Sequence, residues 1–203
     1  KKFIHYQGDK KMINRAIIDD KKLKQIFQYI ETLQNHRQIK MMFQLSFMGL
    51  RCVNFCYLQV KDIQNDDLSI KSIIELSADK NKGPKKARYY LNSKLRSELK
   101  EYVKWLSSKK KITSDTYLFT SQKTGKPYLR NSLSRIFSNI YNTFGLECST
   151  HYGRRHFITE NLTAGVDITT VKTLVNHSNI QTTALYYNTN EKLLSNVVER
   201  IKI

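Results

Sequence analysis

Acidic residues, cysteines and prolines are all scarce in this 203-residue chain. The 17 Asp and Glu residues face 35 Lys and Arg, a net charge of +18 that excludes an acidic, self-solubilising chain. The three cysteines, Cys52, Cys56 and Cys148, are an odd number without Cys-x-x-Cys spacing. They argue against a disulfide framework and a cysteine-rich zinc site, and we expect buried free thiols. With two prolines and 40% hydrophobic residues, the chain is expected to fold rather than to form a disordered basic tail.

Long apolar runs and phosphate-binding loops are also missing. No run of about 18 apolar residues is present, and Lys1 to Lys11 contain no hydrophobic stretch of a signal peptide. We therefore expect a soluble, cytoplasmic protein without a membrane span. The sequence has no GxxxxGK[ST] loop, so ATP-driven chemistry has no support.

Positive charge is what the chain has in excess. Such a charge attracts polyanions, and each Lys or Arg placed on a phosphate releases counterions, so nucleic acid is the leading partner. An anionic membrane is the other candidate, but it would require a basic amphipathic helix or a lipid anchor, whereas these basic residues are spread along the chain. Composition also leaves open a basic surface that only keeps the chain soluble.

Hydrophobic periodicity predicts a mostly helical chain. Residues 1–17 are polar and basic and are interpreted as a linker or N-terminal arm. One helix is predicted to begin at Asp19 or Asp20 as N-cap, and a second, more deeply buried helix to end at Gly49. Further helices are predicted over residues 95–106, 133–144, 154–164 and 167–176.

A small sheet is predicted in the middle of the chain. The turn Asn65-Asp66-Asp67 precedes a strand around Leu68 to Leu76, and a second strand is predicted around Arg88 to Leu91. The segment from Lys80 to Lys86 joins them. The predicted fold class is therefore α+β, mostly helical, with a small antiparallel β-sheet.

Three short motifs carry the candidate chemistry. Met48-Gly49-Leu50-Arg51 ends a buried helix with an arginine where an apolar residue would continue the core. His151-Tyr152-Gly153-Arg154 places an imidazole and a guanidinium three residues apart, so that on a helical turn both can point at one spot. Asn176-His177-Ser178 is followed, nine residues after the histidine, by Tyr186.

In these motifs and their order, the chain from about residue 19 to 190 resembles the C-terminal catalytic domain of the tyrosine recombinase, or phage-type integrase, family. The segment from Leu58 to Ile63 is also similar to the family's Leu-x-x-x-Asp-Ile pattern. The resemblance implies the tyrosine recombinase catalytic-domain fold over residues 18–190. Residues 191–203 would then form a C-terminal amphipathic helix, which docks either on its own domain or in trans on a neighbour.

The resemblance also implies a set of catalytic residues: Arg51, Lys82, His151, Arg154, His177 and Tyr186. Lys80, Lys85 and Lys86 are rivals of Lys82 for the hairpin lysine. Tyr187 is the rival of Tyr186, although adjacent residues on a helix point about 100° apart, so both cannot reach one phosphate. His156 is expected to be structural.

Two residues depart from the family pattern. Asn54 stands three residues after the first arginine, where the family commonly has glutamate, and Asn176 stands where it has glycine. The first is expected to bear on the orientation of Arg51 and the second on a turn. Neither departure removes a group that performs the chemistry.

The roles implied by the resemblance agree with elementary chemistry. Arg51 and Arg154 can bind the nonbridging phosphate oxygens bidentately as charge develops on them. The phenol of Tyr186, with an ordinary pKa near 10, needs a base, for which His151 is the candidate. A hairpin lysine would protonate the leaving 5′ oxygen and His177 would hydrogen-bond the phosphate. This chemistry requires no metal, cofactor or ATP.

The expected function is a site-specific DNA recombinase that works through a covalent 3′-phosphotyrosyl intermediate. By resemblance its partners are double-stranded DNA, three further copies in a tetramer on two DNA sites, and accessory DNA-bending proteins. A type IB topoisomerase and a non-catalytic DNA-binding module on the same scaffold are the alternatives. The motif around His177 and the small size favour the recombinase.

Overall fold

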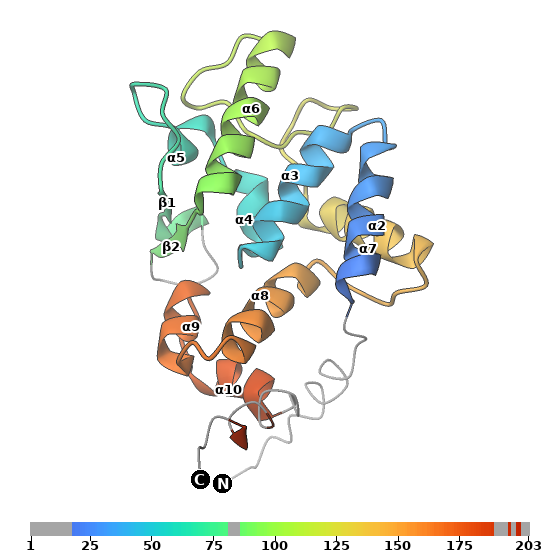
Figure 1. The fold of residues 1–203 in the computed structure, drawn as a ribbon. Coiled ribbons are helices and arrows are strands. Elements are labelled where there is room, and N and C mark those ends of the chain that lie inside the picture. The colour runs from blue at the N-terminus through green and yellow to red at the C-terminus, as the bar shows by residue number, and fades with distance from the viewer. Residues whose placement is uncertain (1–17, 81–85, 189–194, 196–197, 200–203) are drawn as a thin grey trace, which may run out of the picture.

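The computed structural model describes residues 18–80, 86–188, 195 and 198–199, which form a mostly helical fold with one two-stranded antiparallel sheet (Figure 1). The predicted fold class is confirmed. The named elements are α2 (Asp20–Glu31), α3 (His36–Phe47), α4 (Cys52–Tyr57), α5 (Val60–Ile63), β1 (Ile73–Leu76), the 3-10 helix η1 (Ala78–Lys80), β2 (Ala87–Tyr90), α6 (Ser93–Lys109), α7 (Arg130–Thr143), α8 (Tyr152–Thr163), α9 (Ile168–Leu174) and α10 (Gln181–Asn188).

Helix starts follow the predicted capping residues. Asp19, rather than Asp20, is the N-cap of α2, and its carboxylate accepts a hydrogen bond from the Lys22 backbone N–H. Asp167 caps α9 in the same way by accepting from Thr169 and Thr170. In both helices a short acceptor side chain satisfies backbone donors that the first turn leaves without a partner.

The sheet is shorter than the sequence predicts at its first strand. β1 begins at Ile73, not at Leu68, because Leu68 lies in a turn with φ of 66° and is 68% exposed. In that turn the Leu68 backbone N–H donates to the Asn65 carbonyl. β1 pairs with β2 with Glu75 opposite Arg88, and the strands bury alternate residues, so Ile74, Leu76, Ala87 and Tyr89 point inward.

The main core surrounds α3. Figure 1 shows α3 between α2 and α6, and α3 also packs on α8. Phe43 of α3 stacks on Phe137 of α7 with ring centroids 4.2 Å apart, and Phe55 of α4 stacks on the same ring at 6.3 Å. The three cysteines are buried within this core, as expected.

The contact between α3 and α8 is close enough to require a glycine. A Cβ added at Gly153 would lie 2.5 Å from the Ser46 Oγ atom and 2.9 Å from the Ser46 carbonyl carbon. Across the same contact the Ser46 hydroxyl donates to the Thr150 carbonyl at 3.4 Å. The glycine between His151 and Arg154 therefore sets how near the start of α8 comes to the buried helix.

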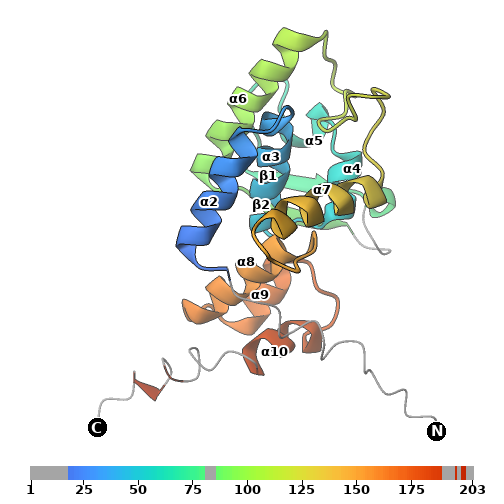
Figure 2. The ribbon, with the colours of Figure 1, turned by 90° about the vertical axis from the view of Figure 1, so that its right-hand side faces the viewer.

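A second, smaller core lies beneath the C-terminal motifs. It consists of Ile158 and Leu162 of α8, Val171 of α9 and Val175, which directly follows α9. Tyr186 of α10 packs against this core. In both views α8, α9 and α10 lie together at one end of the molecule (Figures 1 and 2), and α9 contacts β2. The sheet and the C-terminal helices thus meet at one place.

Candidate active site

Arg51 lies at the junction of α3 and α4, where the chain turns at Gly49 with φ of 88°. Its guanidinium donates from Nη2 to the Asn176 carbonyl at 2.9 Å and from Nη1 to the Tyr89 hydroxyl at 3.5 Å. The acceptors come from the turn after α9 and from β2. Arg51 is therefore held by two segments that are far from it in the sequence.

Arg154 comes from the first turn of α8 and is only 4% exposed. Its two terminal nitrogens donate to the carbonyls of Gly49 and Val175. Burial, and then the nearby positive charge of Arg51, lower the pKa of Arg154 to about 10. It still carries its charge at pH 7, so two like charges lie together in a partly dehydrated place, and an anion bound there would relieve their repulsion.

His177 follows the turn that binds both arginines. Its Nδ1 atom is hydrogen-bonded to the hydroxyl of the fully buried Thr183 at 2.9 Å. Burial, followed by the charges of Arg154 and Arg51, lowers the pKa of His177 to about 3. The imidazole is therefore neutral at pH 7, and the contact with Thr183 leaves its Nε2 atom for another partner.

His151 immediately precedes α8 and keeps an exposed edge. Loss of water around its ring lowers the pKa of His151, and the charges of Arg154, Arg130, Arg155 and Arg51 add to this effect. A neutral imidazole beside an arginine pair can accept a proton. Arg130, at the exposed start of α7, is thus also near the site.

Tyr186 lies on α10, partly buried against the small core of α8 and α9. It is near enough to Arg154 that its phenol acts to raise the pKa of that guanidinium, against the larger effect of burial. Tyr186 is therefore near Arg154. The side chain of its rival, Tyr187, lies outside the described residues.

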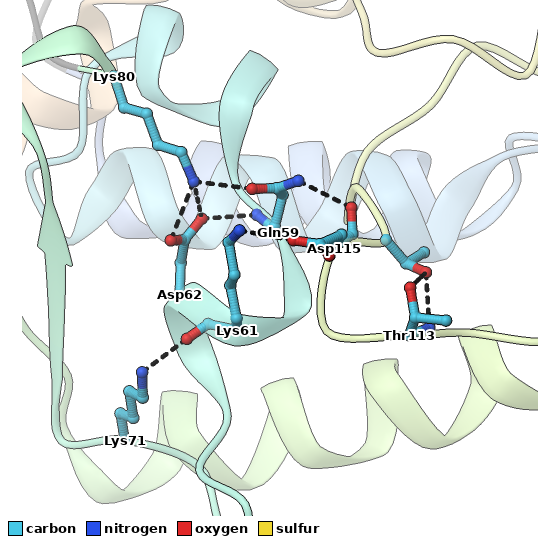
Figure 3. Close-up of polar contacts among 8 residues, drawn as sticks. Gln59, Lys61, Asp62, Lys71, Lys80, Thr113 and Asp115 are labelled. Carbon is cyan, nitrogen blue, oxygen red and sulfur yellow. Dashed lines mark hydrogen bonds and ion pairs between the residues drawn. The ribbon is translucent and has the colours of Figure 1, made fainter.

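Lys82 and its rival Lys85 also lie outside the described residues, which leave out 81–85. The rival Lys80 is described, and its Nζ atom donates to both carboxylate oxygens of Asp62, at 2.9 and 3.1 Å, and to Gln59 Oε1 at 2.9 Å (Figure 3). The side chains of Lys80 and Asp62 are 19% and 11% exposed. Lys80 is thus bound to α5, whereas Lys86 is exposed.

Asn54 is completely buried and contacts the backbone of Arg51 rather than its guanidinium. Its Oδ1 atom accepts from the Arg51 backbone N–H at 3.2 Å and from the Tyr89 hydroxyl at 3.0 Å. Its Nδ2 atom donates to the Lys80 carbonyl at 3.2 Å. Asn54 therefore links the start of α4 to η1 and to β2.

Tyr89 and Thr183 contact the predicted site residues but were not predicted. Tyr89 is fully buried, and the alternation of the strand around it identifies an inward position without indicating that its hydroxyl meets Arg51. Thr183 lies six residues after His177, in the first turn of α10, and nothing in its residue type marks it. Both contacts depend on how separate elements pack.

No metal site is found in the part of the chain that the structure describes. Among the described residues, no group of three or more His, Cys, Asp and Glu side chains lies close enough together to hold a metal ion. Within those residues there is also no helix with the length and apolar character needed to span a bilayer.

Two curated proteins are similar in sequence to this chain. The TnP I resolvase of Bacillus thuringiensis is 29% identical over 179 residues, which cover 87% of this chain and 58% of that protein. A tyrosine recombinase of Pseudothermotoga lettingae is 32% identical over 157 residues, 76% of this chain and 50% of that protein. The chain thus spans little more than half the length of these relatives.

Solved structures show the same fold. The XerA recombinase superposes with a TM-score of 0.72 at 20% identity, over 93% of this chain and 66% of that one. The XerH recombinase bound to its palindromic difH substrate gives 0.71 at 18% identity, over 97% and 55%. The phage integrase family pattern matches residues 16–192, and the chain therefore belongs to the phage integrase family.

Proposed function

We propose that this chain is the catalytic part of a site-specific DNA recombinase that cleaves and rejoins strands through a 3′-phosphotyrosyl bond on Tyr186. One observation carries the proposal: Arg51 and Arg154 donate to the consecutive carbonyls of Asn176 and Val175, directly before His177. Two guanidinium groups and a neutral imidazole are thereby held around one point. Tyr186 lies near enough to Arg154 to act on the pKa of its guanidinium.

The arginines bind the phosphate that reacts. As the tyrosine oxygen attacks phosphorus, negative charge grows on the nonbridging oxygens, and fixed guanidinium donors stabilise it. Their backbone contacts hold them in place before DNA arrives, so little reorganisation is needed. His177 donates a further hydrogen bond to the phosphate from Nε2, in the tautomer in which its Nδ1 atom accepts from the Thr183 hydroxyl.

Proton transfer completes the step. His151 accepts the proton of the Tyr186 hydroxyl, and its lowered pKa keeps it neutral and able to do so at pH 7. The phosphorus–tyrosine bond forms while the bond to the 5′ oxygen breaks, and that oxygen takes a proton from a hairpin lysine. We propose Lys82 for this acid, because Lys80 is bound to Asp62.

Rejoining is the reverse reaction with a different 5′ hydroxyl. The phosphotyrosyl ester conserves the energy of the phosphodiester, so exchange of strands needs no ATP. Double-stranded DNA is the partner, and solved relatives are described in complex with DNA, among them the Tn1549 transposon integrase with circular intermediate DNA. We propose that four copies act on two duplexes with accessory DNA-bending proteins, and that residues 191–203 dock on the same or a neighbouring copy.

A covalent trapping experiment tests the proposal. A pool of nicked duplexes with randomised sequence around the nick is incubated with the protein, and DNA that remains attached in SDS is recovered and sequenced. The wild type and Tyr187→Phe are expected to form the complex, whereas Tyr186→Phe is not. A complex formed by Tyr186→Phe but not by Tyr187→Phe would assign the nucleophile to the neighbour.

The same variants distinguish the alternatives. A type IB topoisomerase would relax a supercoiled plasmid that lacks the selected sequence, and the relaxation would be lost in Tyr186→Phe. A non-catalytic DNA-binding protein would retain the selected DNA only without SDS. The recombinase requires covalent capture together with strand exchange between two duplexes that carry the selected sequence.

A further inference from the structure

Asn176 has a backbone conformation that glycine adopts more easily. Its φ is 52°, and apart from Leu68 it is the one non-glycine residue with positive φ in the described part of the chain. Asparagine tolerates this region better than most residues, but glycine does so with less strain. Because the turn itself could be made by glycine, the side chain of Asn176 is the feature that needs an explanation.

That side chain binds both backbone groups of one residue in β2. Its Nδ2 atom donates to the Arg88 carbonyl at 2.7 Å, and its Oδ1 atom accepts from the Arg88 N–H at 3.0 Å. An adjacent strand would use the same two groups. The amide thus occupies the edge of β2 opposite β1 and joins the sheet to the turn after α9. We call this pair of hydrogen bonds the Asn176 bridge.

Both sides of the Asn176 bridge contact Arg51. The Asn176 carbonyl accepts from Arg51 Nη2, and Tyr89, the neighbour of Arg88, accepts from Arg51 Nη1. A shift of β2 relative to the turn would therefore change the separation of the two acceptors that orient one guanidinium. The next residue after the bridge is His177, so the same shift would move Arg51 relative to that imidazole.

We propose that Asn176 is a positioning residue for the cleavage step: the Asn176 bridge fixes β2 against the turn and thereby sets the orientation of Arg51. This rests on the proposed function. Asn176 itself does not contact the reacting phosphate. The bridge performs its role through main-chain atoms of Arg88, so the Arg88 side chain, which pairs with Glu75 at the surface at 2.6 Å, is not part of it.

Asn176→Gly tests the proposal because glycine keeps the turn and removes only the amide. We expect single-turnover formation of the covalent complex on the selected nicked duplex to slow by about tenfold or more, since small misplacements of catalytic groups have large effects on rate. The affinity for the same duplex and the melting temperature should change little, because the freed groups of Arg88 lie at an exposed edge and bind water. An unchanged cleavage rate would overturn the proposal.

Arg88 supplies a matched pair of variants. Arg88→Ala keeps the backbone N–H and is expected to leave the cleavage rate near that of the wild type, whereas Arg88→Pro removes the N–H that Asn176 accepts from, at an edge position where proline is tolerated. Arg88→Pro removes one of the two hydrogen bonds of the bridge and should therefore be slow, and the double variant with Asn176→Gly should be no slower than Asn176→Gly alone, since both changes act on one bridge. Equal rates for Arg88→Pro and Arg88→Ala, or additive losses in the double variant, would contradict the bridge.

A spectroscopic measurement separates this proposal from the proposed function. Without DNA, NMR should show faster hydrogen exchange at the Arg88 amide and shifted Arg51 guanidinium signals in Asn176→Gly, but unchanged Arg51 signals in Arg88→Ala. If the wild type forms no covalent complex, the proposed function fails, and the shifted Arg51 signals alone still support the positioning of this guanidinium. Unchanged Arg51 signals in Asn176→Gly would overturn the inference, whatever the wild type does with DNA.

Discussion

Arg51 and Arg154, 103 positions apart in the chain, donate to the carbonyls of two consecutive residues, Asn176 and Val175. The end of one short helix therefore holds both guanidinium groups. Arg154 also reaches back to the Gly49 carbonyl, two residues before Arg51. Backbone carbonyls thus hold both guanidinium groups in place without DNA. The repulsion between the two positive charges favours the binding of an anion beside them.

Replacing Arg51 with lysine should lower the rate of DNA cleavage more than the affinity for DNA. An ammonium keeps the charge but cannot donate at once to the Asn176 carbonyl, the Tyr89 hydroxyl and a phosphate in a planar arrangement. We expect covalent complex formation to fall by about 10²-fold, the cost of a lost preorganised donor. Single-turnover rates at saturating protein measure this, with Arg135→Lys on the middle of α7 as the control. A loss confined to DNA affinity would contradict the role.

Acid should destabilise the protein through His177. Its pKa is about 3 in the folded state against about 6.5 when unfolded, so below pH 6.5 the unfolded chain binds a proton that the folded chain does not. The contribution of His177 to the free energy of unfolding is therefore fully present above pH 6.5 and is lost as the pH drops toward 3. The loss is less than about 1.4 kcal/mol per pH unit, because the ring keeps some contact with water.

Urea unfolding between pH 7 and pH 4 measures that slope. His177→Gln keeps a polar side chain for Thr183 and has no group that titrates, so its stability should depend less on pH over this range. Equal slopes for His177→Gln and the wild type would mean that other groups account for the acid sensitivity.

Gly153→Ala should destabilise the fold through the contact of α3 with α8. The new methyl would lie 2.5 Å from Ser46 Oγ and 2.9 Å from the Ser46 carbonyl carbon, so the helices must separate. Overpacking of this kind costs about 1–3 kcal/mol. Adding Ser46→Ala should recover part of the loss in urea unfolding, since it removes the nearer atom. Gly153 is not among the glycines with positive φ, so the backbone strain that Gly125→Ala would introduce does not add to this loss.

Lys80 and Lys61 should differ in what their ion pairs contribute. Lys80→Met leaves the Asp62 carboxylate, 11% exposed, without its cation and should lower the free energy of unfolding by about 1–3 kcal/mol. Lys61→Met breaks the pair of Lys61 with Asp115, whose side chains are 49% and 68% exposed, and should lower the free energy of unfolding by less than Lys80→Met does. Denaturant unfolding compares them, and equal losses would show that burial does not distinguish the two pairs.

Much of the fold follows from local pattern. The apolar periodicity gives the helices, and short acceptors at Asp19 and Asp167 give two of their starts, because capping involves atoms only two or three residues apart. The start of β1 was predicted wrongly. A run that contains Leu68 has strand composition, whereas a left-handed turn is stabilised by the Asn65 carbonyl and the Asp67 side chain.

The sequence by itself determined which residue types and spacings are present: an arginine after Gly49-Leu50, the His151 to Arg154 motif, and a tyrosine nine residues after His177. Their membership of one family follows from that order. Only the tertiary structure decided that Lys80 binds Asp62, that Tyr89 meets Arg51, and that Asn176 joins β2 to the site. These contacts join elements far apart in the chain, and their geometry depends on how the two cores pack, which no local pattern encodes.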